Sequence, residues 1–268
     1  MKFVSPKSFI IGETSLVQEG VQDFLEFLGV PDWKTDSASD AEELIEIAGK
    51  TCYMSFSTDL NSNLTRVGGR NNHDYIQQGL VATKHGSCLE HATVTFALMN
   101  VSRIVTHELV RHRQGAAYSQ LSGRYVRLDE IVMADLPSCL ENDGYAKSVV
   151  EQAVATTETF MKTLSKYFDL DNSTNFAFKK EVTSAIRRII GNGQANHIIA
   201  TFNHRAIRHI ISMRSSVHAE EEIRQRQALR RFRIGFDSFH VEGTRLRIDA
   251  GPDRPEIADD HADNERDG

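Results

Sequence analysis

Three arginines and several hydroxyl groups are concentrated in residues 111–125, which read RHRQGAAYSQLSGRY. Arg111 and Arg113 flank His112, and a Ser-Gly-Arg motif follows at residues 122–124. Guanidinium groups donate paired, charge-assisted hydrogen bonds to phosphate and carbonyl oxygens, and they remain charged at neutral pH. A glycine beside them lets the backbone approach a ligand closely. The segment therefore predicts an anion-binding site, whereas an isolated Arg-His-Arg triplet is more typical of a solvated helix end.

Two further segments contain the same residue types. Residues 85–91 read HGSCLEH and precede the apolar run 92–99. Further along the chain, residues 203–209 read NHRAIRH and residues 213–220 read MRSSVHAE. In this order, and together with the arginine-rich segment, these blocks resemble the signature of the flavin-dependent thymidylate synthases. The resemblance covers roughly residues 48–230 and implies methylation of dUMP with FAD, methylenetetrahydrofolate and NADPH.

The resemblance implies roles for individual residues. The positions that match the family's flavin contacts are Ser87, Arg111, His112, Arg113, Gln120, Asn203, Arg205 and His209. The positions that match its contacts to dUMP are Glu108, Arg111, Gln120, Leu121, Ser122, Gly123, Arg124, Arg188 and Arg214. Arg214 matches the arginine that activates the uracil ring. His85 matches a histidine near the flavin edge and is a second catalytic candidate, for which a structural role is nearly as well supported.

The chain departs from the family pattern at three places. The spacer before the Ser-Gly-Arg motif has eight residues where seven is also common, which leaves the alignment of residues 114–118 open by one. Residues 187–192 read RRIIGN in place of Arg-x-x-Leu-Pro, which favours Arg188 as the dUMP contact and leaves Arg187 as the alternative. Lys50 replaces a usual arginine, and we expect this difference to alter only a surface contact.

The implied chemistry explains why arginines dominate these motifs. Uracil C5 becomes nucleophilic when negative charge develops on N3 and O4, and a guanidinium at that edge stabilises the charge. By resemblance, reduced flavin supplies the hydride that completes the methyl group. No enzyme cysteine is expected to act as nucleophile, because Cys52, Cys88 and Cys139 lie outside the arginine-rich segment.

Other catalytic motifs fail on inspection. Residues 107–111, His-Glu-Leu-Val-Arg, begin like a zinc-protease helix but place arginine at the second ligand position, so no metal is expected. No Gly-x-Gly-x-x-Gly motif follows a strand, and no P-loop is present. FAD would therefore bind outside a Rossmann fold, with its pyrophosphate held by arginines and helix ends.

Charge and composition restrict the possible partners. The formal net charge is −6, and residues 249–268 alone hold eight acids and two arginines, also a net charge of −6, so the preceding residues are neutral overall. A neutral body argues against the main rival, a non-enzymatic nucleic-acid-binding protein. A second rival, a flavoprotein of the same fold that only oxidises NADPH, stays open. We expect dUMP, folate and NADPH as partners, and no nucleic acid.

Localisation follows from the absence of targeting signals in the sequence. The first seven residues lack the apolar core of a signal peptide, and no apolar run is long enough to span a bilayer. The three cysteines are too few and too scattered for a disulfide framework or a thiolate metal site. These features predict a cytoplasmic protein with no membrane partner.

The elements that must position these residues predict an α+β fold. Extended segments are expected within 1–12 and at 91–99, 123–134 and 198–202, and helices at 16–28, 40–50, 74–84, 101–113, 144–168 and 176–190 and from Asn203 onward. Asp40 is the expected N-cap of the second helix, and residues 58–73 read as a long polar loop. Residues 1–250 are expected to form one domain, and residues 251–268 an acidic, disordered tail.

Family resemblance sharpens this fold to an antiparallel sheet flanked by helices, a non-Rossmann flavin fold assembled as a homotetramer with active sites at subunit interfaces. The helix that begins at Asn203 is expected to serve two environments. At 100° per residue, Asn203, Ile207, Ile210 and Arg214 share one stripe, and Arg205, His209 and Ser212 lie on the opposite side.

Overall fold

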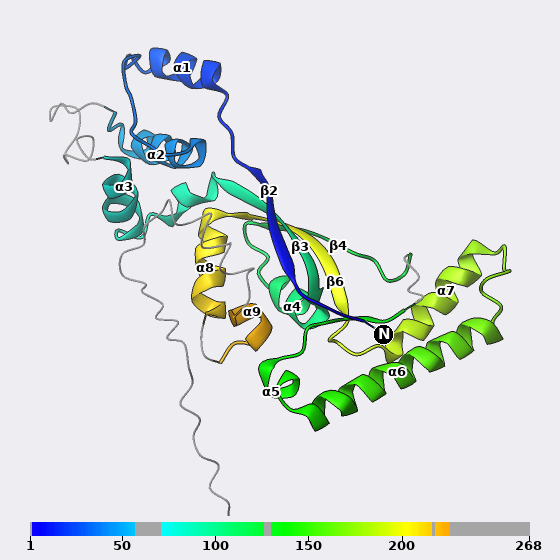
Figure 1. The fold of residues 1–268 in the computed structure, drawn as a ribbon. Helices are drawn as coiled ribbons and strands as arrows, with labels where there is room; N and C mark the ends of the chain where they lie inside the picture. Colours follow the sequence, from blue (N-terminus) through cyan, green and yellow to red (C-terminus); the bar gives the residue numbers. More distant parts are fainter. Residues whose placement is uncertain (1, 57–70, 126–129, 216–217, 226–268) are drawn as a thin grey trace, which may run out of the picture.

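A four-stranded antiparallel sheet forms the centre of the computed structural model, which describes residues 2–56, 71–125, 130–215 and 218–225 (Figure 1). Its strands lie in the order β2-β3-β6-β4. Their bounds are Lys7–Glu13 for β2, Thr93–Ser102 for β3, Ala195–Asn203 for β6 and Ala116–Gln120 for β4. The antiparallel sheet expected from the sequence is therefore present, with β4 as a strand that the sequence reading did not include.

Alternation along the two central strands buries one face of this sheet. The buried positions are Val94, Phe96 and Leu98 on β3 and Ile198, Ala200 and Phe202 on β6. Helices α4 (Arg103–Leu109) and α8 (His204–Arg214) complete the core on this face. On the opposite face, the Thr95 and Thr201 hydroxyls lie 2.9 Å apart, and Phe9 and Ile199 are exposed. One face of the sheet is thus packed with helices and the other remains partly open.

A two-stranded parallel sheet corrects the expectation of an antiparallel sheet alone. Strand β1 (Lys2–Val4) pairs in parallel with β5 (Val132–Ala134). Among the described residues of the extended segment expected at 123–134, strand β5 covers the last three, and residues 126–129 lie outside the described part. A three-residue strand shows too little alternation to be recognised in a sequence.

Helix α1 (Gln18–Phe27) and helix α2 (Asp40–Tyr53) match two expected helices. The N-cap of α2 is Ser39 rather than Asp40, because the Ser39 hydroxyl accepts the Glu42 backbone N–H. The carboxylate of Asp40 accepts the Leu16 backbone N–H instead, at 2.8 Å.

Lys50 corrects a second expectation, because its side chain is 1% exposed and makes no surface contact. Its ammonium lies 3.4 Å from the Glu46 carboxylate and 4.8 Å from the centre of the Tyr75 ring. A buried ammonium requires such compensation, since burial of an unpaired charge is costly. The lysine therefore belongs to the packing between α2 and the segment that contains Tyr75.

The helical segment expected at 74–84 is formed by the end of α3 (Asn72–Asp74) and by the π-helix η2 (Tyr75–Val81), which a turn follows. The 3₁₀ helix η3 (Gly86–Glu90) comes after this turn. The polar loop expected at 58–73 lies mostly outside the described residues.

Helix α4 is shorter than the helix expected at 101–113. Strand β3 continues to Ser102, whose hydroxyl then caps α4 by accepting the Val105 N–H at 3.2 Å. The helix ends at Leu109, so the Arg-His-Arg triplet lies in the turn that follows it.

Helices α6 (Gly144–Tyr167) and α7 (Phe176–Ile186) form a hairpin that projects from the sheet (Figure 1). Before it lies α5 (Ser138–Glu141), after it the 3₁₀ turn η4 (Arg187–Ile189), and α9 (Glu221–Gln225) ends the described chain. The hairpin exposes large aromatic side chains, namely Tyr145, Phe160, Tyr167 and Phe176. Within the described ranges, no helix is sufficiently long and apolar to cross a membrane. The tail at 251–268 lies outside them.

Candidate functional site

Helix α8 begins at the expected cap and has the two faces predicted from its sequence. The Asn203 side-chain oxygen accepts the Ala206 N–H at 2.8 Å, so its amide acts locally as the N-cap. Ile207 and Ile210 are buried, whereas Arg205 and His209 are exposed on the other side. The exposed face of the helix therefore offers Arg205 and His209 for contact with a ligand, while its apolar stripe packs on the sheet.

Arg214, at the end of α8, is held by two groups from the α4 region. Its Nη1 donates to Glu108 Oε2 at 2.9 Å, and its Nη2 donates to the Glu108 backbone oxygen at 3.3 Å. Its Nε donates to His112 Nε2 at 3.2 Å. The Arg214 side chain is 22% exposed, which leaves the guanidinium fixed but accessible. Three residues proposed for the site thus form one cluster.

The surroundings of His112 keep its ring neutral. Burial lowers the pKa of His112, and the neighbouring Arg214 and His209 lower it further. The His209 ring packs edge-to-face on His112, with ring centres 5.6 Å apart. Because Nε2 accepts from Arg214, the ring proton of neutral His112 lies on Nδ1. His112 therefore orients Arg214 without competing with it as a second cation.

Two residues that the sequence reading missed hold the Arg-His-Arg turn in place. The Tyr118 hydroxyl lies 2.6 Å from the His112 backbone oxygen and 2.7 Å from that of Leu109, and burial raises the pKa of Tyr118 to about 12. Gly115 has φ +67°, and the Asn203 side chain occupies the space that a Cβ at Gly115 would need. In the sequence, the Gln114-Gly115 pair indicates a turn, and the alternation of Ala116 and Tyr118 indicates a strand with one inward face.

The flavin candidates from the 85–91 block lie around η3. Arg205 forms an ion pair with Glu90, and a Cβ at Gly86 would lie 3.3 Å from the Arg205 Nε. Ser87 is exposed in the same turn. Tyr53, another residue that the sequence reading missed, hydrogen-bonds the His85 ring, with 2.7 Å between the hydroxyl and Nε2.

Both arginines of the triplet, Arg111 and Arg113, have exposed side chains. Gln120 is also exposed, and its amide donates to the Thr106 hydroxyl at 3.2 Å. The Leu121 backbone N–H donates to the His197 oxygen at 2.8 Å, which fixes the start of the Ser-Gly-Arg loop. Arg124 in that loop is exposed.

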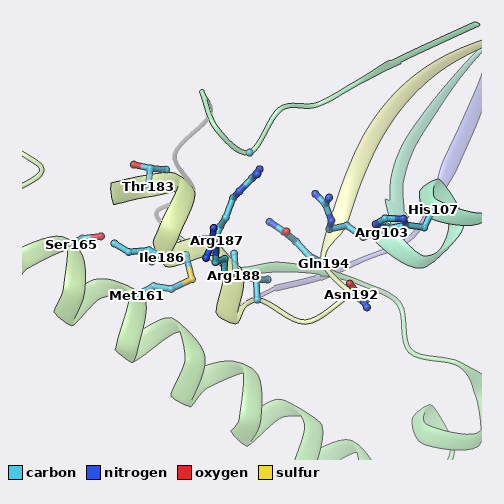
Figure 2. Close-up of a pocket in the computed structure, with 12 residues that line it drawn as sticks. Arg103, His107, Met161, Ser165, Thr183, Ile186, Arg187, Arg188, Asn192 and Gln194 are labelled. Atoms are coloured by element: carbon cyan, nitrogen blue, oxygen red, sulfur yellow. The ribbon is translucent and has the colours of Figure 1, made fainter. Parts of the chain in front are cut away.

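A cavity of about 250 Å³ lies between α4, the 122–124 loop and the α6–α7 hairpin (Figure 2). The side chains that line it include Arg103, His107, Arg187, Arg188, Asn192, Gln194, Ser165 and Thr183. No carboxylate is among the described residues that line it, so the cavity is electropositive. This chemistry suits a phosphate-bearing ligand.

The two alternative arginines both line this cavity but differ in what they contact. A Cβ at Gly123 would lie 2.9 Å from the Arg187 Nη1, so Arg187 reaches the nucleotide loop. Figure 2 shows Arg187 and Arg188 between the side of the cavity formed by Arg103 and the side formed by Thr183. The geometry therefore favours Arg187 for contact with a ligand held at Gly123, although the sequence pattern favours Arg188.

The proposed dUMP contacts fall into two groups within one chain. Gly123, Arg187 and Arg188 line the cavity, but Glu108 and Arg214 do not. Helix α4 supplies His107 to the cavity and Glu108 to the Arg214 cluster.

The three cysteines differ in their exposure to solvent. Cys52 and Cys139 are exposed, and Cys88 is buried. Burial raises the pKa of Cys88, and the Cys52 thiol raises it further. Among the residues that the structure describes, no cluster of three or more His, Cys, Asp or Glu side chains could hold a metal ion.

Comparison with known proteins places this geometry in context. A family model described as "Thymidylate synthase complementing protein" matches residues 35–231. The flavin-dependent thymidylate synthase of Mycobacterium tuberculosis (strain H37Rv) is 37% identical over 208 residues, 75% of this chain and 78% of that protein. The Mycobacterium marinum enzyme of the same name is 36% identical over 207 residues, with the same coverage.

Two solved structures share the fold. The UMP/dUMP methylase PolB from Streptomyces cacaoi, bound with 5-Br dUMP, aligns with a TM-score of 0.59 at 13% identity, covering 89% of this chain and 93% of its own. Thymidylate synthase X from Helicobacter pylori, with FAD and dUMP, aligns with a TM-score of 0.52 at 18% identity, covering 87% and 92%. At these identities, the alignments show the fold alone.

Proposed function

Since the chain belongs to the flavin-dependent thymidylate synthase family, we propose that it methylates dUMP at C5 to give dTMP. In this proposal, methylenetetrahydrofolate donates the one-carbon unit, and NADPH supplies the reducing equivalents through FAD. The observation that supports it most directly is the fixed Arg214 guanidinium, held by Glu108 and His112 at the end of α8.

Arg214 is the proposed activating group. A guanidinium has five N–H donors, and three are used toward Glu108 and His112, which leaves one on each terminal nitrogen. A preorganised pair of donors at the uracil edge would stabilise negative charge as it develops on N3 and O4. Glu108 and His112 act here as positioning residues, because they hold the guanidinium plane before substrate binds.

The cavity is the proposed site of the nucleotide phosphate. Ser122 and Gly123 would contribute hydroxyl and backbone donors, and Arg124 would supply the counter-charge. Arg187 lies against Gly123 and is our choice for the further arginine on dUMP. The absence of carboxylates from the described lining means that a dianionic phosphate would meet only attractive or neutral groups there.

The residues around η3 and the Arg-His-Arg turn fit a bound FAD. Arg111, Arg113 and Ser87 are exposed, and Arg205 lies across Gly86, where a larger residue would displace it. These groups would hold the flavin phosphates, with Gln120, Asn203 and His209 as further proposed contacts. When bound, the flavin supplies the hydride transfer that the protein's own side chains cannot perform.

A homotetramer with active sites between subunits is part of the proposal. The residues proposed to contact dUMP fall into two groups within one chain, as expected if each site combines residues from two subunits. The open sheet face and the exposed aromatic residues of α6 and α7 supply apolar surface for such contacts.

The proposal predicts that the protein binds FAD and that Arg111→Ala or Arg113→Ala weakens flavin retention. Loss of one charge-assisted contact costs about 1.5–3 kcal/mol, or roughly tenfold or more in affinity. The measurement is the flavin absorption band after desalting, with and without dUMP. The matched control is Arg124→Ala, which removes the same charge from the nucleotide loop and should leave flavin retention unchanged. A colourless protein that ignores added FAD would end the proposal.

A second prediction concerns cysteine chemistry. The thiolate is the nucleophilic form of cysteine, and burial together with Cys52 raises the pKa of Cys88. Cys52 and Cys139 do not line the cavity. A variant with serine at all three positions is therefore expected to retain measurable dTMP formation, with Cys139→Ser as a single-site control. Complete loss of turnover in a folded, flavin-loaded triple variant would point to covalent catalysis instead.

A further inference from the structure

Glu90 and Arg205 meet where helix α8 packs against η3. Glu90 is the last residue of η3, and Arg205 is the second residue of α8. The Arg205 Nη1 donates to Glu90 Oε1 at 2.5 Å. At the other end of η3, a Cβ at Gly86 would lie 3.3 Å from the Arg205 Nε and 3.6 Å from its Cδ. The Arg205 side chain therefore spans η3 from Gly86 to Glu90.

This ion pair lies at the surface, where it contributes little to folding. The Arg205 side chain is 53% exposed and the Glu90 side chain 36%. Exposed ion pairs add little to stability because water and salt screen them. The pair does, however, restrict a long side chain that would otherwise sample many rotamers. A ligand of Arg205 would then lose less free energy to side-chain ordering.

The fixed guanidinium can still bind an anion. A guanidinium carries five N–H donors on three nitrogens, so the contact of Nη1 with Glu90 leaves the two donors of Nη2 for a phosphate oxygen. Ser87 follows Gly86 in η3 and is exposed. Its hydroxyl and the Arg205 guanidinium thus come from two elements that pack together, and both are suited to a phosphate.

We propose that Glu90 is a positioning residue for the FAD diphosphate, because it holds Arg205 over η3 in the orientation that binds phosphate. This inference rests on the proposed function, in which Arg205 and Ser87 contact the flavin phosphates. It deepens that function by assigning a role to a carboxylate that itself would not touch the cofactor.

Charge alone predicts the opposite effect of Glu90. A carboxylate near a phosphate repels it, so its removal would strengthen FAD binding. Positioning predicts that its removal weakens FAD binding. Salt separates the two effects, because dissolved ions screen the repulsion between exposed charges but do not restore the orientation of Arg205.

The test measures FAD affinity by titrating the flavin-free, full-length chain with FAD in about 0.5 M sodium chloride, where the screening length falls to a few ångströms. Flavin fluorescence reports binding. Glu90→Met removes both the charge and the acceptor and should weaken FAD binding about fivefold, a fraction of the ordering cost of an arginine side chain. Glu90→Gln keeps an acceptor oxygen without the charge and should recover part of the loss. Glu19→Met, which makes the same exchange on the exposed surface of α1, is the control and should bind FAD normally.

A double variant tests whether Glu90 acts through Arg205. Arg205→Met should weaken FAD binding more than Glu90→Met does. The double variant should bind FAD no more weakly than Arg205→Met alone, because Glu90 then has no guanidinium to orient. The urea unfolding midpoints of Glu90→Met and the unmodified chain should agree, since the pair is exposed.

Two results would overturn the positioning role. One is FAD binding by Glu90→Met that equals or exceeds that of the unmodified chain at this salt concentration, and the other is full additivity of the two losses in the double variant. Either result, with normal FAD binding by the unmodified chain, leaves the proposed function intact. A failure of the unmodified chain to bind FAD would instead overturn the proposed function and this inference with it.

Discussion

Replacing Arg214 by lysine is expected to lower the turnover number for dUMP methylation about a hundredfold, the effect of removing one preorganised donor at a developing negative charge. Lysine keeps the positive charge but loses the planar fork. It cannot reproduce the donation to Glu108 and His112 together with two donors directed at uracil. Nucleotide affinity should fall only modestly, because the lost interaction is strongest in the transition state.

Arg124→Lys is the matched control, because it makes the same exchange on a proposed phosphate contact. A phosphate contact is equally strong in the ground and transition states, so this variant should raise the KM for dUMP with little change in kcat. Steady-state kinetics at saturating folate and NADPH, with flavin content checked, separates the two effects. If Arg214→Lys changed KM alone, Arg214 would be a binding residue, and His85 or Arg187 would be the next candidate for activation.

The parts of the site that could be predicted from sequence are those defined by local pattern. Asn203 caps α8, and the separation of Ile207 and Ile210 from Arg205 and His209 follows from helical geometry alone. The family resemblance is also local, because its motifs are short blocks in a fixed order. The match of the family model to residues 35–231 confirms the resemblance.

The parts that could not be predicted depend on contacts between segments far apart in sequence. The close packing of Gly115 against Asn203 and the hydrogen bond of Tyr53 to His85 join different elements, and neither residue pair has a pattern of its own. Lys50 looked like a surface residue because charge usually indicates exposure. Its pairing with Glu46 and its position over an aromatic ring became visible only in the folded chain.

The choice between Arg187 and Arg188 shows the same limit. Without the family's Leu-Pro, the sequence offers two adjacent arginines in a 3₁₀ turn. In a turn of three residues, adjacent side chains point about 120° apart, so only one can face a given loop. The close approach of Arg187 to Gly123 is the reason that we propose Arg187 for this contact.

Acid is expected to destabilise the protein through His204, the first residue of α8. Its side chain is 2% exposed, and burial lowers its pKa from 6.5 to about 4. A charge there would also face the positive end of the helix dipole. In the unfolded chain His204 would titrate near 6.5, so the folded state binds its proton less readily. The contribution of this histidine is complete above pH 6.5 and is lost as the pH falls toward 4.

The size of this effect sets the experiment. The difference between the His204 pKa in the unfolded and the folded chain removes roughly 3 kcal/mol from the free energy of unfolding between pH 6.5 and 4. Burial, Arg214 and His209 lower the pKa of His112 as well, which acts in the same direction. Burial raises the pKa of Glu42, which acts in the opposite direction. His204→Gln keeps a buried polar group of similar size but cannot titrate, so its urea unfolding midpoint should depend less steeply on pH over this range. If the urea midpoint depended on pH equally steeply in His204→Gln and in the unmodified chain, the acid sensitivity would belong to other groups. Glutamine does not titrate, so residue 204 could not contribute to the pH dependence of this variant.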